Sequence, residues 1–288
     1  MTSLVVVLCA VLGPADAHEK ANPIFREMRQ KGLDVGAETP IKFPAPLMKD
    51  GESDEAQQAI LRKVIGEDFD YAEFTRNSPV APNKLVLREV TPAGPMSVTR
   101  QVEATFVAHG NLDAIANKEF LSRVLDLNRK EGKAADLPEA KLKERGIEFQ
   151  DRDHEGYGHI DFNLIEKVAL KITGHSYWSK TEDSIIAVGV LDRRFQKDAE
   201  FPNEWRPILR AGGGKKTGKP SPYSGAAYYV KITRLAKPKG AVFVEGHILF
   251  AEPEGWFEGS NLLRAKLPAV IQNQVRTFRR ELIKASEK

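Results

Sequence analysis

The chain has 288 residues, which is enough for one large domain or two small ones. Hydrophobic residues make up 41% and charged residues 29%, a balance that can bury a substantial core beneath an ordinary soluble surface. The net charge of +3 is small and evenly spread, which argues against nucleic acid as a partner, because nucleic-acid binders concentrate basic charge in a patch.

The first 17 residues have the features of a secretory signal. Leu4–Gly13 is an uncharged apolar run, shorter than the roughly 20 residues of a membrane-spanning helix. The small-x-small sequence Ala15–Ala17 suits signal peptidase, so we expect cleavage after Ala17 and an exported protein, periplasmic or extracellular. No Lys or Arg precedes the run, so the alternatives are a start further upstream or an N-terminal anchor. No other segment is apolar and long enough to cross a bilayer.

Cysteine usage narrows the chemistry of the mature chain. The only cysteine, Cys9, lies inside the predicted signal. The mature chain therefore has no disulfides, no thiolate metal site and no thiol nucleophile, and its stability must come from its core.

Residues 18–53 are predicted to form an irregular N-terminal arm. The stretch "NPIFREMRQKGL" favours a short helix ended by Gly32, and prolines 40, 44 and 46 favour an extended chain after it. The arm carries apolar residues that we expect to pack onto the body of the protein: Ile41, Phe43, Leu47 and Met48. Residues 54–288 are predicted to form a single domain, because strands and helices interleave there without a clean linker.

The first half of that domain mixes helices and strands. Ser53 is a plausible cap for a helix over residues 54–66. Alternating apolar and polar residues predict two strands, and Asn111 is expected to cap the next helix. The predicted elements are strands at 84–90 and 97–110, a helix at 112–127, a charged loop at 128–136 and a short helix at 137–146.

The second half is mainly β. Alternation of apolar and polar residues is typical of an antiparallel sheet with one face buried. If the face carrying Ile172 is the core, His175 on the other face is exposed. The predicted elements are strands at 165–180 and 184–195 joined by a "TED" turn, a polar loop at 196–224, and strands at 226–236 and 241–253 joined by a "KPKG" hairpin.

The chain is predicted to end in a helix over residues 268–285. Apolar residues recur there every three or four positions, which is the period of a helix that buries one side. Such a helix spans about 27 Å, long enough to cross a sheet.

The order of these elements resembles the helix-grip superfamily, which includes the START-type lipid-transfer domains and the birch-pollen-allergen-like proteins. "AEPEGWFEGSNLLRAKLPAVIQNQVRTFRRELIKA" looks like the last strand, loop and gripping helix of that group. The resemblance covers roughly residues 54–288 as element order only. It implies an α+β fold in which a curved antiparallel sheet packs on a long C-terminal helix and encloses an apolar cavity for lipids, sterols or polyketides. It carries over no binding residue, because the superfamily has no diagnostic motif.

The stretch "GGGKKTGKPS" at 212–221 nearly spells a phosphate-binding loop. Gly213, Gly218 and Lys219 match G-x-x-x-x-G-K, but Pro220 stands where the magnesium-binding hydroxyl belongs. The preceding "EWRPILRA" is a weak strand at best, and a strand follows where a helix N-terminus is needed. We therefore interpret this stretch as a mobile basic loop between strands.

The stretch "DRDHEGYGHIDF" at 151–162 is the candidate metal site. His154 and His159 could bind zinc, with Glu155 as ligand or base, which would make a metal-dependent hydrolase. The spacing of five and two nearby glycines oppose a helical H-E-x-x-H site. A polar turn that enters a strand is the favoured interpretation.

Two other patterns are weak. "GHSYW" at 174–178 begins like a nucleophile elbow but has Trp178 where glycine is needed, so Ser176 is an improbable nucleophile. Arg194 could grip a carboxylate or phosphate, although an ion pair with a neighbouring strand is the simpler role.

Aromatic side chains could line a pocket, although most aromatics in such a sheet belong to the core. The candidate ligand-binding residues are Trp178, Arg194, Tyr228, Phe250 and Trp256.

The leading hypothesis is an exported, non-catalytic protein that binds a lipid-like small molecule between sheet and helix, with no cofactor. The alternatives are the metal-dependent hydrolase and a cell-envelope interaction module that uses the arm and the basic terminal helix.

Overall fold

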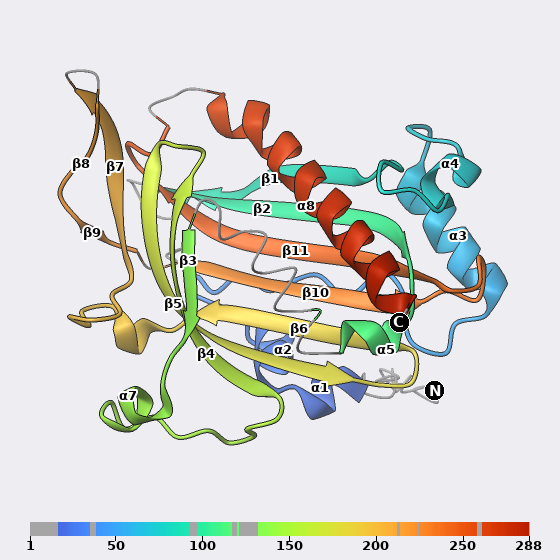
Figure 1. The fold of residues 1–288 in the computed structure, drawn as a ribbon, viewed down its shortest axis with the longest axis horizontal. Helices are drawn as coiled ribbons and strands as arrows, with labels where there is room; N and C mark the ends of the chain where they lie inside the picture. The colour runs from blue at the N-terminus through green and yellow to red at the C-terminus, as the bar shows by residue number, and fades with distance from the viewer. Residues whose placement is uncertain are drawn as a thin grey trace, which may run out of the picture.

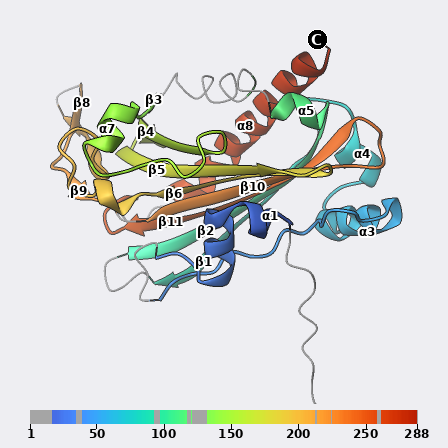
Figure 2. The same ribbon diagram turned by 90° about the horizontal axis from the view of Figure 1, so that it is seen from below.

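The computed structural model describes residues 17–34, 39–92, 97–116, 120, 132–211, 214–223, 225–257 and 261–287. In these residues eleven strands form one antiparallel sheet with helices on both sides (Figures 1 and 2). The expected α+β class is confirmed, and so is the helix-grip arrangement of a large curved antiparallel sheet with a long C-terminal helix across it. No helix in the described residues is long and apolar enough to cross a membrane.

Eight strands follow one another across the sheet in the order β1-β2-β11-β10-β6-β5-β4-β3. Their bounds are β1 Lys84–Pro92, β2 Ser97–His109, β3 Gly132–Asp136, β4 Glu155–Leu164, β5 Val168–Lys180, β6 Ser184–Leu191, β10 Ala226–Arg234 and β11 Ala241–Pro253. Every neighbouring pair is antiparallel.

Two predicted loops contain strands. The charged segment 128–136 includes β3, which pairs with β4 at the edge of the sheet. The polar segment 196–224 includes β7 (Glu204–Ala211), β8 (Gly214–Thr217) and β9 (Ser221–Pro222). β7 pairs with residues 168–171 of β5, beyond the point where β6 ends, and so continues the sheet. The loop predictions were wrong here because these short strands gain their order from long-range pairing, which local composition does not report.

One face of the sheet, the helix face, carries α8 (Leu262–Ser286) and α5 (Leu112–Ile115) (Figure 2). Apolar side chains at alternate strand positions meet Val275, Phe278 and Leu282 of α8 there. These strand residues are Phe106, Ile185, Ile232, Val242 and Val244. Most of the helix predicted at 112–127 lies outside the described residues, and Asn111 caps α5 as expected.

The C-terminal helix begins earlier than predicted. Its first residue is Leu262, so Pro268 lies inside the helix and not at its start. Proline favours the first turn because it has no amide hydrogen to donate, which is why the sequence indicated a start at 268. Buried Leu263 and Leu267 pack against Trp256 and Phe257 and hold this earlier turn in place. The helix is about 37 Å long at 1.5 Å per residue.

The opposite face, the arm face, is covered by the N-terminal segment and the two helices after it. The covering elements are α1 (Ala17–Ala21), α2 (Pro23–Gln30), α3 (Asp54–Ile65) and α4 (Tyr71–Thr75). Phe25, Met28 and Phe43 pack on Tyr229 and Val188, while Met48 and Leu61 pack on Phe243. The expectation of one buried face was therefore wrong: both faces of the sheet are covered.

Local signals in the arm behave as predicted. Asn22 accepts a hydrogen bond from the Phe25 amide and starts α2, and Gly32 ends that segment with a φ of 81°. Phe43 and Met48 are buried against the body as expected, but Leu47 is exposed. Ser53 caps α3 through the Ala56 amide.

A buried ionic network fastens the arm to the sheet. Lys231, in the middle of β10, is fully buried, and its Nζ lies 2.8 Å from Asp50 Oδ1 at the end of the arm. Asp50 also accepts hydrogen bonds from the hydroxyls of Ser184 and Thr181, each at 2.6 Å. His18 Nε2 lies 2.7 Å from the Ser184 hydroxyl; since that hydroxyl donates to Asp50, Nε2 must carry the hydrogen. The network therefore ties the first and last parts of the arm to β6 and β10.

A second buried carboxylate holds the arm further along. Glu245 of β11 lies opposite Lys231 in the strand register and is fully buried. It accepts hydrogen bonds from the backbone amides of Leu47 and Met48, at 2.7 and 3.4 Å. The arm is thus part of the folded body and not a linker.

We expect Asp50→Asn to lower the free energy of unfolding by about 3 kcal/mol, because it leaves the Lys231 ammonium buried without its counter-charge. Urea unfolding at pH 7 measures the effect. Asp113→Asn is the matched control: it breaks the exposed ion pair with Lys180 and should cost less than about 1 kcal/mol. Equal losses in the two variants would contradict the role given to the network.

The same carboxylate predicts a pH dependence. Burial raises the pKa of Asp50, but hydrogen bonds from Lys231, Ser184 and Thr181 outweigh burial and bring it below its ordinary value. A lowered folded-state pKa contributes stability above the unfolded-state value of about 3.9, and this stability is lost as the pH falls through the folded-state pKa. The stability gap between wild type and Asp50→Asn should therefore be full at pH 7 and shrink below pH about 4.

Candidate functional site

The candidate site is a row of side chains that crosses the helix face. The strand registers place Ile248 of β11 beside Tyr228 of β10, and Tyr228 beside Gly189 of β6. Ser176 of β5 and Gly156 of β4 continue the row. Because side chains alternate along a strand, all five positions point to the side on which α8 lies.

The large side chains of this row are incompletely covered. Tyr228 is 41% exposed and Ile248 is 37% exposed, although both lie on central strands of the sheet. Ile160 of β4, on the same face, is 38% exposed. Apolar side chains at the centre of a sheet are normally buried, so the exposure of the neighbouring Tyr228 and Ile248 makes this part of the helix face the candidate site.

The Tyr228 side chain lies along the sheet. Burial raises the pKa of its hydroxyl, although solvent still reaches the side chain. Its ring lies over Gly189: a Cβ at that position would stand 2.4 Å from Tyr228 Cε1. The absence of a side chain at 189 therefore allows the tyrosine to lie flat along the sheet.

Residues with small side chains or none line the helix face beside Tyr228. Gly156 and Gly158 of β4 face Ser176 and Gly174 of β5, and Gly189 of β6 follows. Five neighbouring positions on this face thus carry a glycine or a serine. The Tyr228 ring covers Gly189, and the small residues at the other four positions leave space above the backbone. Our sequence reading missed these residues, although Gly-x-Gly at 156–158 and Gly-x-Ser at 174–176 show the two-residue spacing of one strand face.

α8 covers only part of this face. The strand closest to it is β2, near the opposite edge from β4 and β5. Buried Arg279 holds the helix there by donating hydrogen bonds to the backbone oxygens of Val107, Ala81 and Pro82. Burial lowers the pKa of Arg279 to about 10, so its guanidinium stays charged at neutral pH. The part of the helix face that these glycines and Ser176 line is therefore not filled by the helix backbone.

Three of the four predicted aromatic residues, Trp178, Tyr228 and Phe250, lie on the helix face of the sheet. Trp178 of β5 packs at the edge of the core beneath α8, and its indole Nε1 donates to the Asp153 backbone oxygen at 2.9 Å. Phe250 of β11 and buried Trp256 have parallel rings 6.5 Å apart. Trp256 also contacts Trp205 and Tyr223, so it closes the end of the sheet as a core residue. Tyr228 is the one of these aromatics that presents an open surface.

Arg194 lies away from this site. Its guanidinium is held by Asp192, two residues earlier, with Nη2 2.6 Å from Oδ2. It also lies over the Tyr157 ring, on the arm face of β4. The pair is local and does not link two strands.

The candidate metal residues are each used in separate hydrogen bonds. Glu155 accepts from the backbone amides of Gln150 and Asp151 and binds His175 at 2.7 Å. His154 binds Asp151, whereas His159 binds the Thr173 hydroxyl. In the described residues no group of three or more His, Cys, Asp or Glu side chains could hold a metal ion. The turn-and-strand interpretation of 151–162 therefore fits the structure, and the metal alternative does not.

His175 is not exposed, contrary to the expectation. Its ring stacks on Tyr157 with centroids 4.4 Å apart, and burial lowers its pKa. The reason is that α7 (Glu139–Lys143) and the segment around it cover the arm face at β4. Pro138 precedes α7 and Gly146 follows it, within the segment 137–146 that was predicted to contain a short helix.

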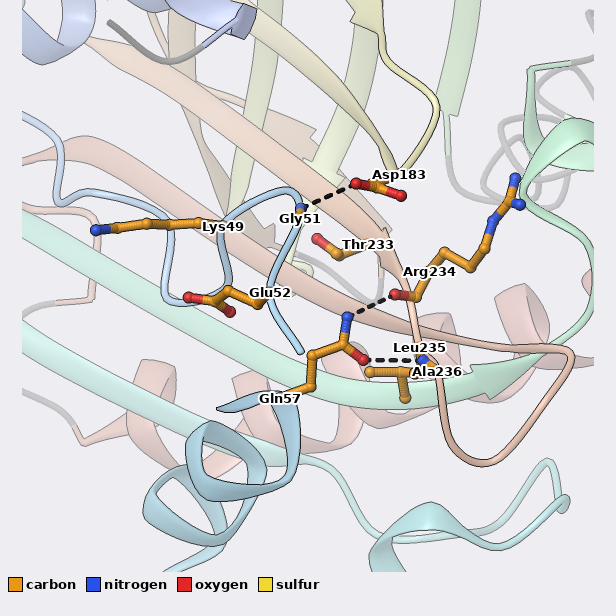
Figure 3. Close-up of a pocket in the computed structure, with 9 residues that line it drawn as sticks. All are labelled: Lys49, Gly51, Glu52, Gln57, Asp183, Thr233, Arg234, Leu235 and Ala236. Atoms are coloured by element: carbon orange, nitrogen blue, oxygen red, sulfur yellow. Dashed lines mark hydrogen bonds between the residues drawn. The ribbon is translucent and has the colours of Figure 1, made fainter. Parts of the chain in front are cut away.

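A small cavity of about 240 Å³ lies on the other side of the sheet (Figure 3). Two hydrogen bonds lie beside it: the Gly51 amide donates to Asp183, and the Gln57 side chain donates to the Arg234 backbone oxygen. The buried Thr233 hydroxyl faces it. The cavity lining mixes polar side chains with apolar ones such as Leu235 and Ala236, and its volume suits water or a small molecule and not a lipid-like ligand.

We expect Gly189→Ala to destabilise the protein by about 1–3 kcal/mol, because the new methyl group displaces the Tyr228 ring. In the Tyr228→Ala background the same substitution should cost clearly less, since the obstructing ring is gone. Urea unfolding of the four proteins gives the coupling energy. Additive losses would show that the ring does not lie over residue 189.

The sequence matches no family model and no curated protein. Among solved structures, the chain is similar to the human StarD13 (DLC2) lipid transfer and protein localization domain, with 13% identity and a TM-score of 0.42 over 77% of this chain and 94% of that one. It is also similar to human STARD10, with 7% identity and a TM-score of 0.38 over 85% of this chain and 83% of that one. The helix-grip arrangement itself rests on the sheet and α8 of this chain.

Proposed function

We propose that this protein binds a hydrophobic or amphipathic small molecule between α8 and the helix face of the sheet, without catalysing a reaction. The observation that carries the proposal is the exposure of two neighbouring side chains on central strands, Tyr228 and Ile248, on the face that carries α8. A ligand that covers these side chains gains about 25 cal/mol for each Å² of apolar surface removed from water. The small residues Gly156, Gly158 and Gly174 give such a ligand room beside them.

The chemistry of the row favours an amphipathic ligand. Tyr228 supplies an aromatic face and a hydroxyl that can donate or accept a hydrogen bond. Its neighbours in the row are Ile248 on one side and Gly189 on the other. A largely apolar molecule with one polar group near Tyr228 therefore fits the row better than a sugar or a nucleotide.

The placement of potential catalytic groups supports a binding role. Ser176 is the nucleophilic hydroxyl of the row, and it donates to the Gly156 backbone oxygen at 3.2 Å. His175 and His159 belong to the arm face of β5 and β4, and His247 stacks on Tyr229 there. His154 contacts Trp178 on the same face as Ser176 but is bound to Asp151. Among the described residues no hydrogen bond joins Ser176 to a histidine that could serve as a base.

We also propose that the protein is exported. The apolar run Leu4–Gly13 and the small-x-small sequence before His18 support this. Cleavage after Ala17 leaves as first residue His18, whose side chain is buried and hydrogen-bonded to Ser179 and Ser184. The cut would therefore spare the residue with which the arm begins its contacts.

A ligand retained through purification should appear in native mass spectra as a mass shift that denaturation removes. Ile248→Asn should weaken binding of that ligand, or of a fluorescent fatty-acid probe, by about tenfold, because a buried apolar contact is replaced by an amide. The matched control is Val270→Asn, which changes an exposed apolar residue of α8. No retained ligand and no probe binding would overturn the proposal.

Export makes a separate prediction. Expressed in a secreting host, the protein should be recovered outside the cytoplasm with His18 as its N-terminal residue, as read by Edman sequencing. Ala17→Phe should block processing, because signal peptidase requires a small residue at that position. An intact N-terminus on cytoplasmic protein would contradict this part of the proposal without touching the ligand site.

A further inference from the structure

The β7–β8 hairpin stands away from the body of the protein, at the upper left of Figure 1. β8 pairs with β7 through registers that run from Ile208 opposite Thr217 to Ala211 opposite Gly214. All four residues of β8 are exposed. The hairpin is therefore an exposed two-stranded projection of the sheet.

The hairpin is rich in positive charge. Residues 204–219 contain five basic residues and one acidic residue. Glu204 is within ion-pair distance of Lys171 and Arg206, and Lys215 lies 3.3 Å from Glu166 in the neighbouring turn. Lys167, Lys216 and Lys219 are exposed and have no carboxylate within ion-pair distance among the described residues. This end of the molecule thus presents unneutralised cations.

An exposed apolar side chain accompanies these cations. Leu209 is 52% exposed and lies opposite Lys216 in the register, so both project from the same side of the hairpin. Lysines on an edge strand often serve to prevent pairing with another chain. An exposed leucine beside them works against that purpose. Cations around an apolar side chain complement a surface that is anionic outside and apolar beneath.

We propose that the β7–β8 hairpin docks the protein on the surface of an anionic lipid bilayer. Lys216, Lys219 and Lys167 face the negatively charged headgroups, and Leu209 enters the boundary between headgroups and acyl chains. A nucleic acid would satisfy the lysines but leave Leu209 in water, which is why the bilayer is the favoured partner. The proposal goes beyond ligand binding and does not depend on it.

The hairpin continues toward the end of the helix face at which α8 begins. Trp205 of β7 packs with Trp256, Leu262 and Leu263 in one cluster. Docking through the hairpin would therefore bring this end of the helix face toward the bilayer. That orientation would give a lipid-like ligand a short path between the membrane and the candidate site.

Sedimentation of the full chain with vesicles tests the proposal. The probes are vesicles of phosphatidylcholine with 30% phosphatidylglycerol, and vesicles of phosphatidylcholine alone. We expect binding to the anionic vesicles only, and weaker binding as salt is raised. The double variant Lys216→Gln/Lys219→Gln should reduce partitioning by about fivefold per lysine, on the order of 25-fold in all. Leu209→Asn should reduce it by roughly fivefold to tenfold.

The matched control is Lys20→Gln/Lys63→Gln, which removes the same charge from exposed residues outside the hairpin. It should leave vesicle binding unchanged, and unfolding midpoints should show that every variant is folded. The proposal is overturned if the control pair weakens binding as much as the hairpin pair, or if no variant changes it. Equal sensitivity of a fluorescent oligonucleotide to the lysine pair, with no effect of Leu209→Asn on vesicles, would assign the hairpin to nucleic acid and overturn it as well.

Two readouts separate this proposal from the others. Native mass spectrometry should show the same retained ligand in the hairpin variants as in wild type, so loss of docking and loss of ligand are distinguishable. If the lysines serve only to protect an edge strand, the lysine pair should self-associate in light scattering while vesicle binding persists, which would overturn the proposal.

Discussion

The buried ion pair between Lys231 and Asp50 decides how this protein must be built. An ammonium group in the middle of a sheet is costly to remove from water unless a carboxylate meets it. Asp50 comes from a segment that precedes the first strand, so that segment must lie across the sheet for β10 to be buried at all. His18, Ser184 and Thr181 complete the hydrogen bonds of the carboxylate, and Glu245 binds the backbone of the same segment. The arm consequently belongs to the layer that covers one of the two faces of the sheet.

The two faces of the sheet are finished differently. On the arm face, the Phe25 and Phe43 rings pack against Tyr229, and the ionic network is centred on Lys231 of the same strand. On the helix face, α8 is anchored toward β2 by Arg279, while glycines and Ser176 lower the floor of β4, β5 and β6. One face therefore supplies rigidity and the other keeps an apolar surface open. A sheet supported on one side can keep such a surface on the other without collapsing.

The features that suggest function gather toward one end of this framework. The aromatic cluster of Trp205, Tyr223 and Trp256 closes the sheet where α8 begins, and the β7–β8 hairpin extends beyond it. The open row around Tyr228 lies further along the same face. The proposed ligand site and the cationic projection with its exposed leucine thus lie toward the same end of the sheet. The stretch that resembles a phosphate-binding loop belongs to this projection. Its lysines lie on or beside the hairpin strand β8 and not in a nucleotide site.

Local patterns in the sequence determined much of the framework. The helix capped by Ser53, the hairpin between residues 234 and 241, the short helix ended by Gly32 and the apolar stripe of the last helix were all predicted, because each depends on neighbours along the chain. Tyr228 was named as a candidate ligand residue from the sequence, which stays a prediction, and the glycines beside it were not named. Tertiary structure alone decided that the arm face is buried, that residues 204–217 pair as strands, and that α8 starts before Pro268. Those outcomes depend on contacts between residues far apart in sequence, where burial and strand pairing outweigh local preference.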